Sequence, residues 1–380
     1  MDFIINFNKP YLTGKEKDYI SEVLSNGKLS GNGKYTKLCQ NFFTTRYKFH
    51  HSLLTTSCTD ALEMAALLCN IGPSDEVILP SYTFVSTANP FLLRGAKLVF
   101  ADSSEENPNI DASKIESLIT AKTKAIVVVH YAGMACDMKP IIELAEKYSL
   151  KVIEDAAQGI DNYFISENGK RKALGSIGHL GTFSFHETKN ITCGEGGLLS
   201  INNRDLINRA EIIWEKGTNR SAFYRGEIDK YGWVDIGSSF LPSEILASFL
   251  WAQLEHLDLI QKRRKIIWDL YYDGLKEWAF LNEASLPVIP NYSSNNAHLF
   301  YIVCPSLSFR NELIKKLKKE GILAVFHYNS LHKSKFYEKF HDGRNLVNSD
   351  KYSDCLLRLP LYYDLKDDEV GRIIDVIKNN

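Results

Sequence analysis

The sequence has no long apolar run and no excess of charge of either sign. None of its apolar segments approaches the roughly 18 residues that a membrane span needs, and its start lacks the basic and apolar stretches of a signal peptide. Lys and Arg total 45 against 46 Asp and Glu, so the formal net charge is -1 and no overall field attracts nucleic acid or an anionic membrane. We therefore expect a globular chain that binds neither of these partners.

The cysteines follow no regular spacing. The seven cysteines are an odd number scattered over 380 residues, without the close, regular spacing of a disulfide scaffold or a zinc site. No low-complexity tract or fixed-period repeat is present. These absences exclude secreted, collagen-like and disordered proteins, and they predict a reducing, cytoplasmic environment and no metal centre.

Short apolar segments alternate with helix-like segments in the first half of the chain. The strand-like run 53–56 precedes a helical pattern at 61–68. The same alternation recurs at the strand-like runs 76–79, 97–100, 125–129 and 151–154. Wholly apolar strands separated by helices indicate a mostly parallel sheet covered on both faces, which is an α/β arrangement.

The pattern changes near residue 243, where a long helical segment rich in Leu, Ala and Glu begins and continues to 265. This change predicts a large domain over 1–245 and a smaller α+β domain over 246–380. Within the smaller domain we expect strands at 297–303 and 323–326 and helices at 310–320 and 367–378. The lysines of 310–320 predict a solvated face rather than a nucleic-acid surface.

Two charged residues are candidates for a ligand site. Lys189 follows an aromatic strand and precedes the glycine cluster 194–197, where backbone can approach a ligand closely, although an isolated lysine is most often a surface charge. Asp155 follows the strand 151–154, and α/β proteins place ligands at such carboxyl ends. An acid there can equally cap a helix.

Two further features point to an anion. Ser57-Cys58-Thr59-Asp60 lies at a strand-to-helix turn, where free amide N–H groups and the helix dipole favour a phosphate or carboxylate. Plain helix capping explains the same residues. Ser184, five residues before Lys189, can close the same anion site or can be an ordinary strand serine.

Several ordered motifs extend these features over nearly the whole chain, at residues 27–31, 80–87, 154–158, 184–189 and 326–332. Together they resemble the DegT/DnrJ/StrS family of sugar-nucleotide aminotransferases, which are fold type I pyridoxal-phosphate enzymes. The resemblance implies a large domain with a mostly parallel seven-stranded sheet between helices and a smaller C-terminal domain. Segments 130–133, 215–220 and 235–239 are most similar to the branch that makes dTDP-4-amino-4,6-dideoxygalactose.

The resemblance implies a role for individual side chains. Lys189 matches the lysine that forms a Schiff base with pyridoxal phosphate and moves protons, and Asp155 matches the carboxylate that keeps the pyridinium nitrogen protonated. The other implied cofactor contacts are Thr59, Asp60 and Ser184 around the phosphate, Phe84 stacked on the ring and Gln158 beside its phenolic oxygen. Three histidines are candidates for the substrate side, although each can also be a satisfied core or surface residue: His186, His327 and His332.

The chain departs from the family pattern at two places. Relatives commonly have Gly-x-Asn-x-Arg where this chain has residues 237–241, and that asparagine reaches the phosphate of the neighbouring subunit. Ser239 stands at the asparagine position and can substitute only with a shorter hydroxyl, so the resemblance implies a homodimer with shared sites in which this contact is altered. At Asn329-Ser330 relatives commonly have a proline, which affects the substrate-side loop.

The resemblance implies a cytoplasmic enzyme that converts a dTDP-linked 4-keto-6-deoxyhexose into the 4-amino sugar for bacterial surface polysaccharides, with L-glutamate as amino donor. Three alternatives stay open. The nearest is an aminotransferase that acts at carbon 3 of a related keto sugar. The others are a sugar 3-dehydratase, in which histidine typically replaces the Schiff-base lysine, and a non-catalytic regulatory or structural protein on the same scaffold.

Overall fold

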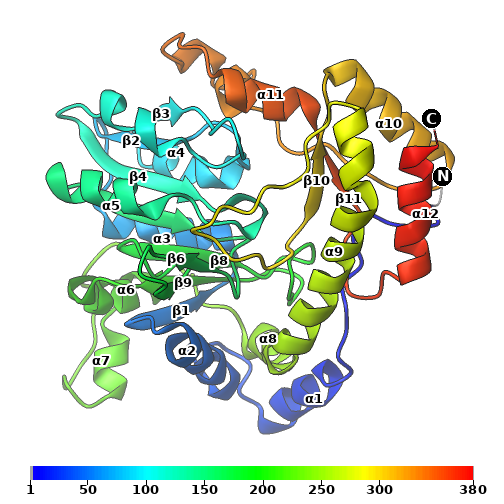
Figure 1. The fold of residues 1–380 in the computed structure, drawn as a ribbon. Coiled ribbons are helices and arrows are strands. Elements are labelled where there is room, and N and C mark those ends of the chain that lie inside the picture. The colour runs from blue at the N-terminus through cyan, green and yellow to red at the C-terminus, as the bar shows by residue number, and fades with distance from the viewer. Residues whose placement is uncertain (1–2, 380) are drawn as a thin grey trace.

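A seven-stranded sheet forms the centre of the large domain, in a computed structural model that describes residues 3–379 (Figure 1). Its strand order is β1-β9-β8-β5-β4-β2-β3. β9 runs antiparallel to β1 and β8, whereas the other neighbouring pairs are parallel. The predicted mostly parallel α/β sheet is therefore confirmed. The strands are β1 (His51–Thr55), β2 (Glu76–Pro80), β3 (Lys97–Ala101), β4 (Thr123–Val129), β5 (Lys151–Asp155), β8 (Leu180–Ser184) and β9 (Gly197–Ile201).

The strands are apolar on both sides because a hydrophobic cluster covers each face of the sheet. In β4, Ile126 and Val128 belong to one cluster and Ala125 and Val127 to the other, as the two-residue period of a strand requires. The first cluster packs under α2 (Lys34–Tyr47), α5 (Met138–Lys147) and α8 (Glu244–Glu255), and α1 (Glu16–Asn26) packs on α8. The second packs under α3 (Cys58–Leu68), α4 (Asn89–Leu93) and α6 (Ile207–Trp214).

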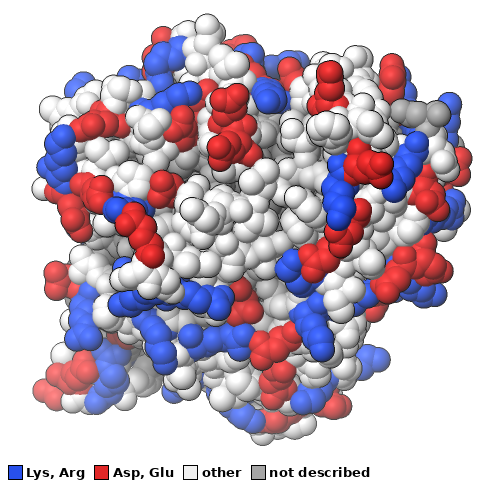
Figure 2. Space-filling model, in the orientation of Figure 1, with Lys and Arg blue, Asp and Glu red and all other residues white. Residues whose placement is uncertain are grey.

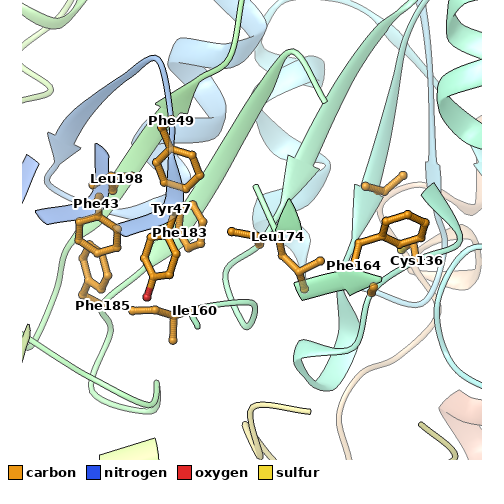
Figure 3. Close-up of a cluster of buried hydrophobic side chains, with 14 of the residues drawn as sticks. Phe43, Tyr47, Phe49, Cys136, Ile160, Phe164, Leu174, Phe183, Phe185 and Leu198 are labelled. Atoms are coloured by element: carbon orange, nitrogen blue, oxygen red, sulfur yellow. The ribbon is translucent and has the colours of Figure 1, made fainter. Parts of the chain in front are cut away.

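Aromatic rings fill one end of the first cluster (Figure 3). The ring of Phe43 on α2 lies 5.5 Å from that of Phe185 and 6.0 Å from that of Phe183 in β8, centroid to centroid. Phe49 lies 5.7 Å from Phe183 on the other side. Aromatic pairs at these separations add to the stability that burial provides. The packing anchors the strand that leads to Ser184 and Lys189.

The smaller domain has a two-stranded antiparallel sheet of β10 (Phe300–Val303) and β11 (Leu356–Leu359). Its helices are α9 (Leu257–Leu281), α10 (Leu307–Lys319), α11 (Val347–Cys355) and α12 (Asp367–Lys378). The strand expected at 323–326 is absent, and that expectation was wrong. Leu323 N–H donates to Ile5 O and Val325 N–H donates to Arg358 O, so this segment alternates between two partners and forms no continuous ladder.

The predicted long helix is two helices, α8 and α9, that meet at His256. Leu250 of α8 and Ile260 of α9 pack in the first large-domain cluster, whereas Ile267 and Leu275 of α9 pack in a third cluster with the smaller domain. The packing therefore changes within α9, beyond the expected boundary at 245. The start of the chain also belongs to the smaller domain's core, because Ile5 packs in the third cluster.

The strands β6 (Tyr163–Ile165) and β7 (Arg171–Ala173) form a hairpin, and the short helix α7 (Arg220–Tyr224) follows α6. Positive and negative side chains are interspersed on the face in Figure 2. No helix within residues 3–379 is long and apolar enough to cross a membrane.

Candidate active site

A cavity of about 470 Å³ lies where β4, β5 and β8 end, and residues of β11 close its other side. Carboxyl ends of parallel strands are the usual ligand sites of α/β proteins. The cavity brings together most of the predicted site residues. These are Thr59, Phe84, Asp155, Gln158, Ser184, His186, Lys189 and His327.

Asp155 is the last residue of β5 and is buried beneath the cavity. Thr87 Oγ1 donates to its Oδ2 at 2.7 Å, and the N–H of Ala157 donates to its Oδ1 at 3.1 Å. Burial raises the pKa of this carboxyl, against the opposing effects of these hydrogen bonds and of Lys189. Turns rather than a helix follow Asp155, so helix capping does not explain it. A cationic ligand atom here would restore the charged form.

Lys189 lies in the loop between β8 and β9, half-buried at the cavity wall. The loop is held by hydrogen bonds from Phe185 N–H to Gly196 O and from Glu187 N–H to Gly194 O. Gly197 belongs to the glycine cluster 194–197, whose backbone was predicted to approach a ligand. In the structure its missing side chain instead allows β9 to pack closely against the start of α3. A Cβ at Gly197 would lie 2.4 Å from Ser57 O and from Cys58 N. The glycine thus joins the lysine loop to the anion-binding turn.

The first turn of α3 borders the cavity through Ser57, Cys58 and Thr59, with Ser184 beside it. The N–H groups at the start of a helix have no acceptors within it, so this turn suits a phosphate. Ser57 Oγ accepts from the N–H of Asp60 at 3.0 Å, which makes Ser57 the cap. Asp60 does not line the cavity, because its N–H serves the cap and its carboxylate accepts from the Thr56 hydroxyl. Capping and cavity lining therefore coexist in one turn.

Phe84 and Gln158 line the same cavity but differ in exposure and in hydrogen bonding. Phe84 is 52% exposed, with its ring 5.7 Å from that of Tyr328, so it presents a free aromatic face. Gln158 is buried, its Oε1 accepts from the N–H of Ala132 at 2.7 Å, and its Nε2 donates to Tyr328 Oη at 3.4 Å. These bonds hold the amide in one orientation.

Only two of the three predicted histidines line the cavity. His186 and His327 line the cavity, and burial together with the charge of Arg358 lowers the pKa of His327 to about 4. His332 does not line it. His332 is buried, with Nδ1 2.7 Å from Ser81 Oγ and Nε2 3.6 Å from an Asp350 oxygen. Through its contact with Ser81, His332 connects the loop after residue 326 to the end of β2.

Ser239 lies away from Lys189, beside a second cavity of about 610 Å³. This cavity is lined by several cations, with Glu215 as its acid: Lys28, Lys37, Lys216 and Arg220. Ser239 pairs with Glu215 through an isolated bridge. Within residues 3–379, Ser239 contributes nothing to the lining of the first cavity.

The cavity residues that the sequence did not predict include three with ionisable side chains: His298, Tyr328 and Arg358. Tyr328 directly follows His327 in the motif 326–332, so the prediction of His327 could have been extended to Tyr328. Arg358 is the one charged residue of the apolar strand β11, and a lone charge in an apolar strand is a signal for a buried functional group. His298 had no comparable signal.

His298 provides a prediction about pH. It is buried, with Nδ1 2.7 Å from Asn190 Oδ1. Burial, together with the charges of Lys189, Arg264 and Arg358, lowers the pKa of His298 well below its usual value. The folded chain therefore binds fewer protons here than the unfolded chain once the pH falls below about 6.5, and acid must favour unfolding.

We expect the His298 contribution to cost up to about 2 kcal/mol of unfolding free energy between pH 7 and pH 5. His298→Gln removes this titration but retains a side chain that can meet Asn190. Urea unfolding of both proteins at the two pH values measures the difference. An equal loss of stability in the wild type and the variant would show that His298 is not a source of acid sensitivity.

Comparisons with known proteins agree with this geometry. The model of the DegT/DnrJ/EryC1/StrS aminotransferase family matches residues 10–378. The chain is 31% identical over 382 residues to the Bacillus subtilis spore coat polysaccharide biosynthesis protein SpsC, with 98% of this chain and 96% of SpsC covered.

Solved structures show the same similarity. Helicobacter pylori PseC, an aminotransferase involved in the biosynthesis of pseudoaminic acid, superposes with a TM-score of 0.88 at 25% identity, covering 99% of this chain and 98% of PseC. The PLP-form of Spr1654 from Streptococcus pneumoniae superposes with a TM-score of 0.87 at 25% identity, covering 98% of this chain and 97% of that one.

The donors of the cavity fit pyridoxal phosphate. It offers the amine of Lys189, the buried carboxylate of Asp155, and the first turn of α3 beside Ser184. These are the partners that an aldehyde, a ring nitrogen and a phosphate require. The fold, the cavity and the family match agree with one another. The chain belongs to the DegT/DnrJ/EryC1/StrS family and is a pyridoxal-phosphate-dependent sugar aminotransferase.

Proposed function

We propose that this enzyme transfers the amino group of L-glutamate to carbon 4 of dTDP-4-keto-6-deoxyglucose and forms dTDP-4-amino-4,6-dideoxygalactose in the cytoplasm. The observation that carries the proposal is the placement of Lys189 and Asp155 in one cavity, within a chain whose motifs resemble that branch. The names of SpsC and PseC connect two similar proteins with spore coat polysaccharide and pseudoaminic acid, which supports a role in bacterial surface sugars.

The side chains of the cavity have separate roles in proton transfer and in cofactor binding. When bound, pyridoxal phosphate supplies an electron sink for the carbon that loses its proton. Lys189 is the group that takes this proton and returns it, because it is the lysine that lines the cavity within residues 3–379. Asp155 would supply a negative charge to the cofactor's ring nitrogen, and the start of α3 with Ser184 would hold its phosphate.

Two further side chains orient the reacting groups. Phe84, with its exposed face, would cover one side of the cofactor's ring, and the fixed amide of Gln158 would interact with its phenolic oxygen. The retained Lys189 counts against the dehydratase alternative, in which the resemblance places a histidine at this position. It also counts against a non-catalytic protein.

The proposal is tested with ¹⁵N-labelled L-glutamate and a panel of keto-sugar nucleotides, followed by NMR of the products. We expect ¹⁵N on carbon 4, an axial amine and one 2-oxoglutarate released per amino sugar. Label on carbon 3 would establish the alternative regiochemistry. Loss of a hydroxyl without label would indicate a dehydratase.

We propose further that the active unit is a homodimer with shared sites. The segment before Ser239 carries exposed apolar side chains, a feature that marks interaction surfaces. They are Tyr224, Tyr231, Trp233, Val234 and Ile236. The cationic cavity beside Ser239 lies in the same region and includes Tyr224. A second copy that covers this surface can bring these cations to an anionic ligand of its partner.

Trp233→Asp should weaken the dimer by at least about tenfold, because Trp233 is 84% exposed in the single chain and a buried charge would replace a large apolar contact. Phe280→Asp is the matched control, since Phe280 is a similarly exposed aromatic, at 83%, on α9 of the smaller domain. Sedimentation equilibrium measures both.

Complementation tests the shared site itself. Lys189→Ala is mixed with a Ser239 variant chosen because it is inactive, and random exchange should restore about a quarter of the activity for a twofold dimer. A wild-type monomer with full activity would contradict the dimer. Absence of complementation after demonstrated exchange would contradict the shared site.

A further inference from the structure

The N-terminal segment forms part of the active-site cavity through Phe7 and Asn8. Two residues earlier, Ile5 packs in the core of the smaller domain and is 1% exposed. Three residues later, the backbone oxygen of Tyr11 accepts from Gln253 Nε2 of α8 at 2.9 Å. The segment is therefore anchored on both domains, and it holds Phe7 and Asn8 between these anchors.

Asn8 is bonded to the loop that carries Lys189. Its Nδ2 donates to Glu187 O at 2.9 Å. A carbonyl oxygen only accepts, so this contact fixes which end of the amide is the nitrogen. Glu187 stands two residues before Lys189, and two residues span at most about 7 Å, so the Asn8 amide lies within about 10 Å of the Lys189 backbone.

Half of the Asn8 amide has no partner. Within residues 3–379 its Oδ1 and the second hydrogen of its Nδ2 make no hydrogen bond. Gln158, the other amide that lines the cavity near Lys189, differs because its Oε1 and Nε2 both contact protein groups. Ligand cavities orient their ligands with a few such polar groups. Asn8 thus offers a ligand one donor and one acceptor.

A sugar hydroxyl is the group that fits this amide. Carboxylates and phosphates only accept and an ammonium group only donates, so each would leave part of the amide unpaired. A hydroxyl both donates and accepts. The keto sugar carries ring hydroxyls beside its ketone, whereas the amino-acid donor carries none. The thymine base also has a donor and an acceptor, but two phosphates and a deoxyribose separate it from the sugar, and Asn8 lies beside the lysine loop.

Phe7 adds an apolar wall beside Asn8. Its half-buried ring lines the cavity and makes no aromatic contact within residues 3–379. A hexose ring presents C–H groups as well as hydroxyls, and a 6-deoxy sugar also carries a methyl group. A phenyl ring next to an amide suits both surfaces. Phe7 and Asn8 also precede residues 10–378, which the family model matches, so no family motif includes them.

We infer that Phe7 and Asn8 form a sugar subsite in which the Asn8 amide binds a ring hydroxyl of the keto sugar, an inference that rests on the proposed sugar substrate. Phe7 packs against the apolar face of the same ring. The amino donor binds without either side chain. Asn8 is therefore a specificity-determining residue for the acceptor, and the N-terminal segment contributes to the choice of sugar.

Equilibrium binding tests the contact without turnover. The probe is dTDP-6-deoxyglucose, which has a hydroxyl in place of the ketone and cannot be aminated, titrated by calorimetry into the pyridoxamine-phosphate form. We expect Asn8→Ala to bind it about 3- to 10-fold more weakly, the loss of a neutral hydrogen bond. Asn6→Ala is the matched control, because Asn6 is an exposed asparagine of the same segment outside the cavity. It should bind like the wild type.

Deoxygenated probes then identify the hydroxyl. In the wild type, removal of the hydroxyl at carbon 2 or at carbon 3 of the probe should weaken binding by the same factor as Asn8→Ala. This comparison needs no variant. In Asn8→Ala, removal of that hydroxyl should cost nothing further, since the two changes remove one contact. Wild-type binding of dTDP-6-deoxyglucose by Asn8→Ala, or independent losses at both hydroxyls, would overturn the assignment.

Separate half-reactions distinguish this contact from a structural role in the lysine loop. Asn8→Ala should react with L-glutamate at the wild-type rate and with the keto sugar at a raised KM. Equal slowing of both half-reactions would mean that Asn8 only holds Glu187, and would overturn the inference. A wild type that reacts with glutamate but aminates no dTDP-keto sugar would refute the proposed sugar substrate. The same comparison with the sugar that is aminated then decides the role of Asn8.

Discussion

Lys189→Ala should lower turnover by more than about 10⁴-fold, because the variant loses the group that moves the proton between donor, cofactor and sugar. Within residues 3–379 no other lysine lines the cavity, so no neighbour can replace the amine. The first turn of α3 and Asp155 are untouched by the change. The cofactor should therefore still bind, without a covalent link. Release of 2-oxoglutarate from L-glutamate measures the loss.

Lys139→Ala is the matched control, since Lys139 is a surface lysine that pairs with Glu167 at 2.7 Å, away from the cavity. It should keep wild-type turnover. A Lys189→Ala protein with bound cofactor and more than about a hundredth of wild-type turnover would show that another base moves the proton.

Asp155→Asn should slow the reaction by about 10²- to 10⁴-fold with little effect on folding. Asparagine has nearly the same shape: its amide oxygen can still accept from the N–H of Ala157, and its amide nitrogen can donate to Thr87 Oγ1 in place of the second hydrogen bond. What disappears is the negative charge beneath the ring nitrogen, on which the electron sink depends. The effect should fall on the rate of each half-reaction and much less on cofactor affinity.

Single-turnover kinetics with L-glutamate measure this rate, and cofactor absorbance measures loading. Thr87→Val is a useful companion, because it removes one hydrogen bond to Asp155 but leaves the charge. Its effect should be smaller than that of Asp155→Asn. Near-normal half-reactions in loaded Asp155→Asn would remove the electrostatic role from this residue.

The large domain could be predicted from the sequence because its buried strands are short apolar runs between helices. β9 was not predicted, since its five residues begin at the last glycine of the cluster 194–197 and include a serine at 200. The division of the long helical pattern at His256 was also missed, because no proline or glycine marks it. Segment 323–326 has a strand-like composition, but its backbone partners lie on two different elements. Local pattern cannot show such tertiary partners.

The same contrast holds at the active site. Asp155, Ser184 and Lys189 were predictable because they stand in continuous motifs at the ends of strands. Asp60 stands beside Thr59 in sequence, yet the helix turn directs its carboxylate to Thr56. Arg358 lies far along the chain and reaches the cavity only because β11 of the smaller domain packs against it.

Reduction of the cofactor-loaded protein with borohydride, followed by peptide mass mapping, tests the central claim most directly. Reduction makes a lysine-linked cofactor permanent, so the peptide that gains its mass identifies the reacting amine. The geometry of the cavity predicts the added mass on Lys189 alone, with none on Lys28, Lys37 or Lys216 of the second cavity. Attachment at any of those lysines, or a purified protein that binds no pyridoxal phosphate, would contradict the account.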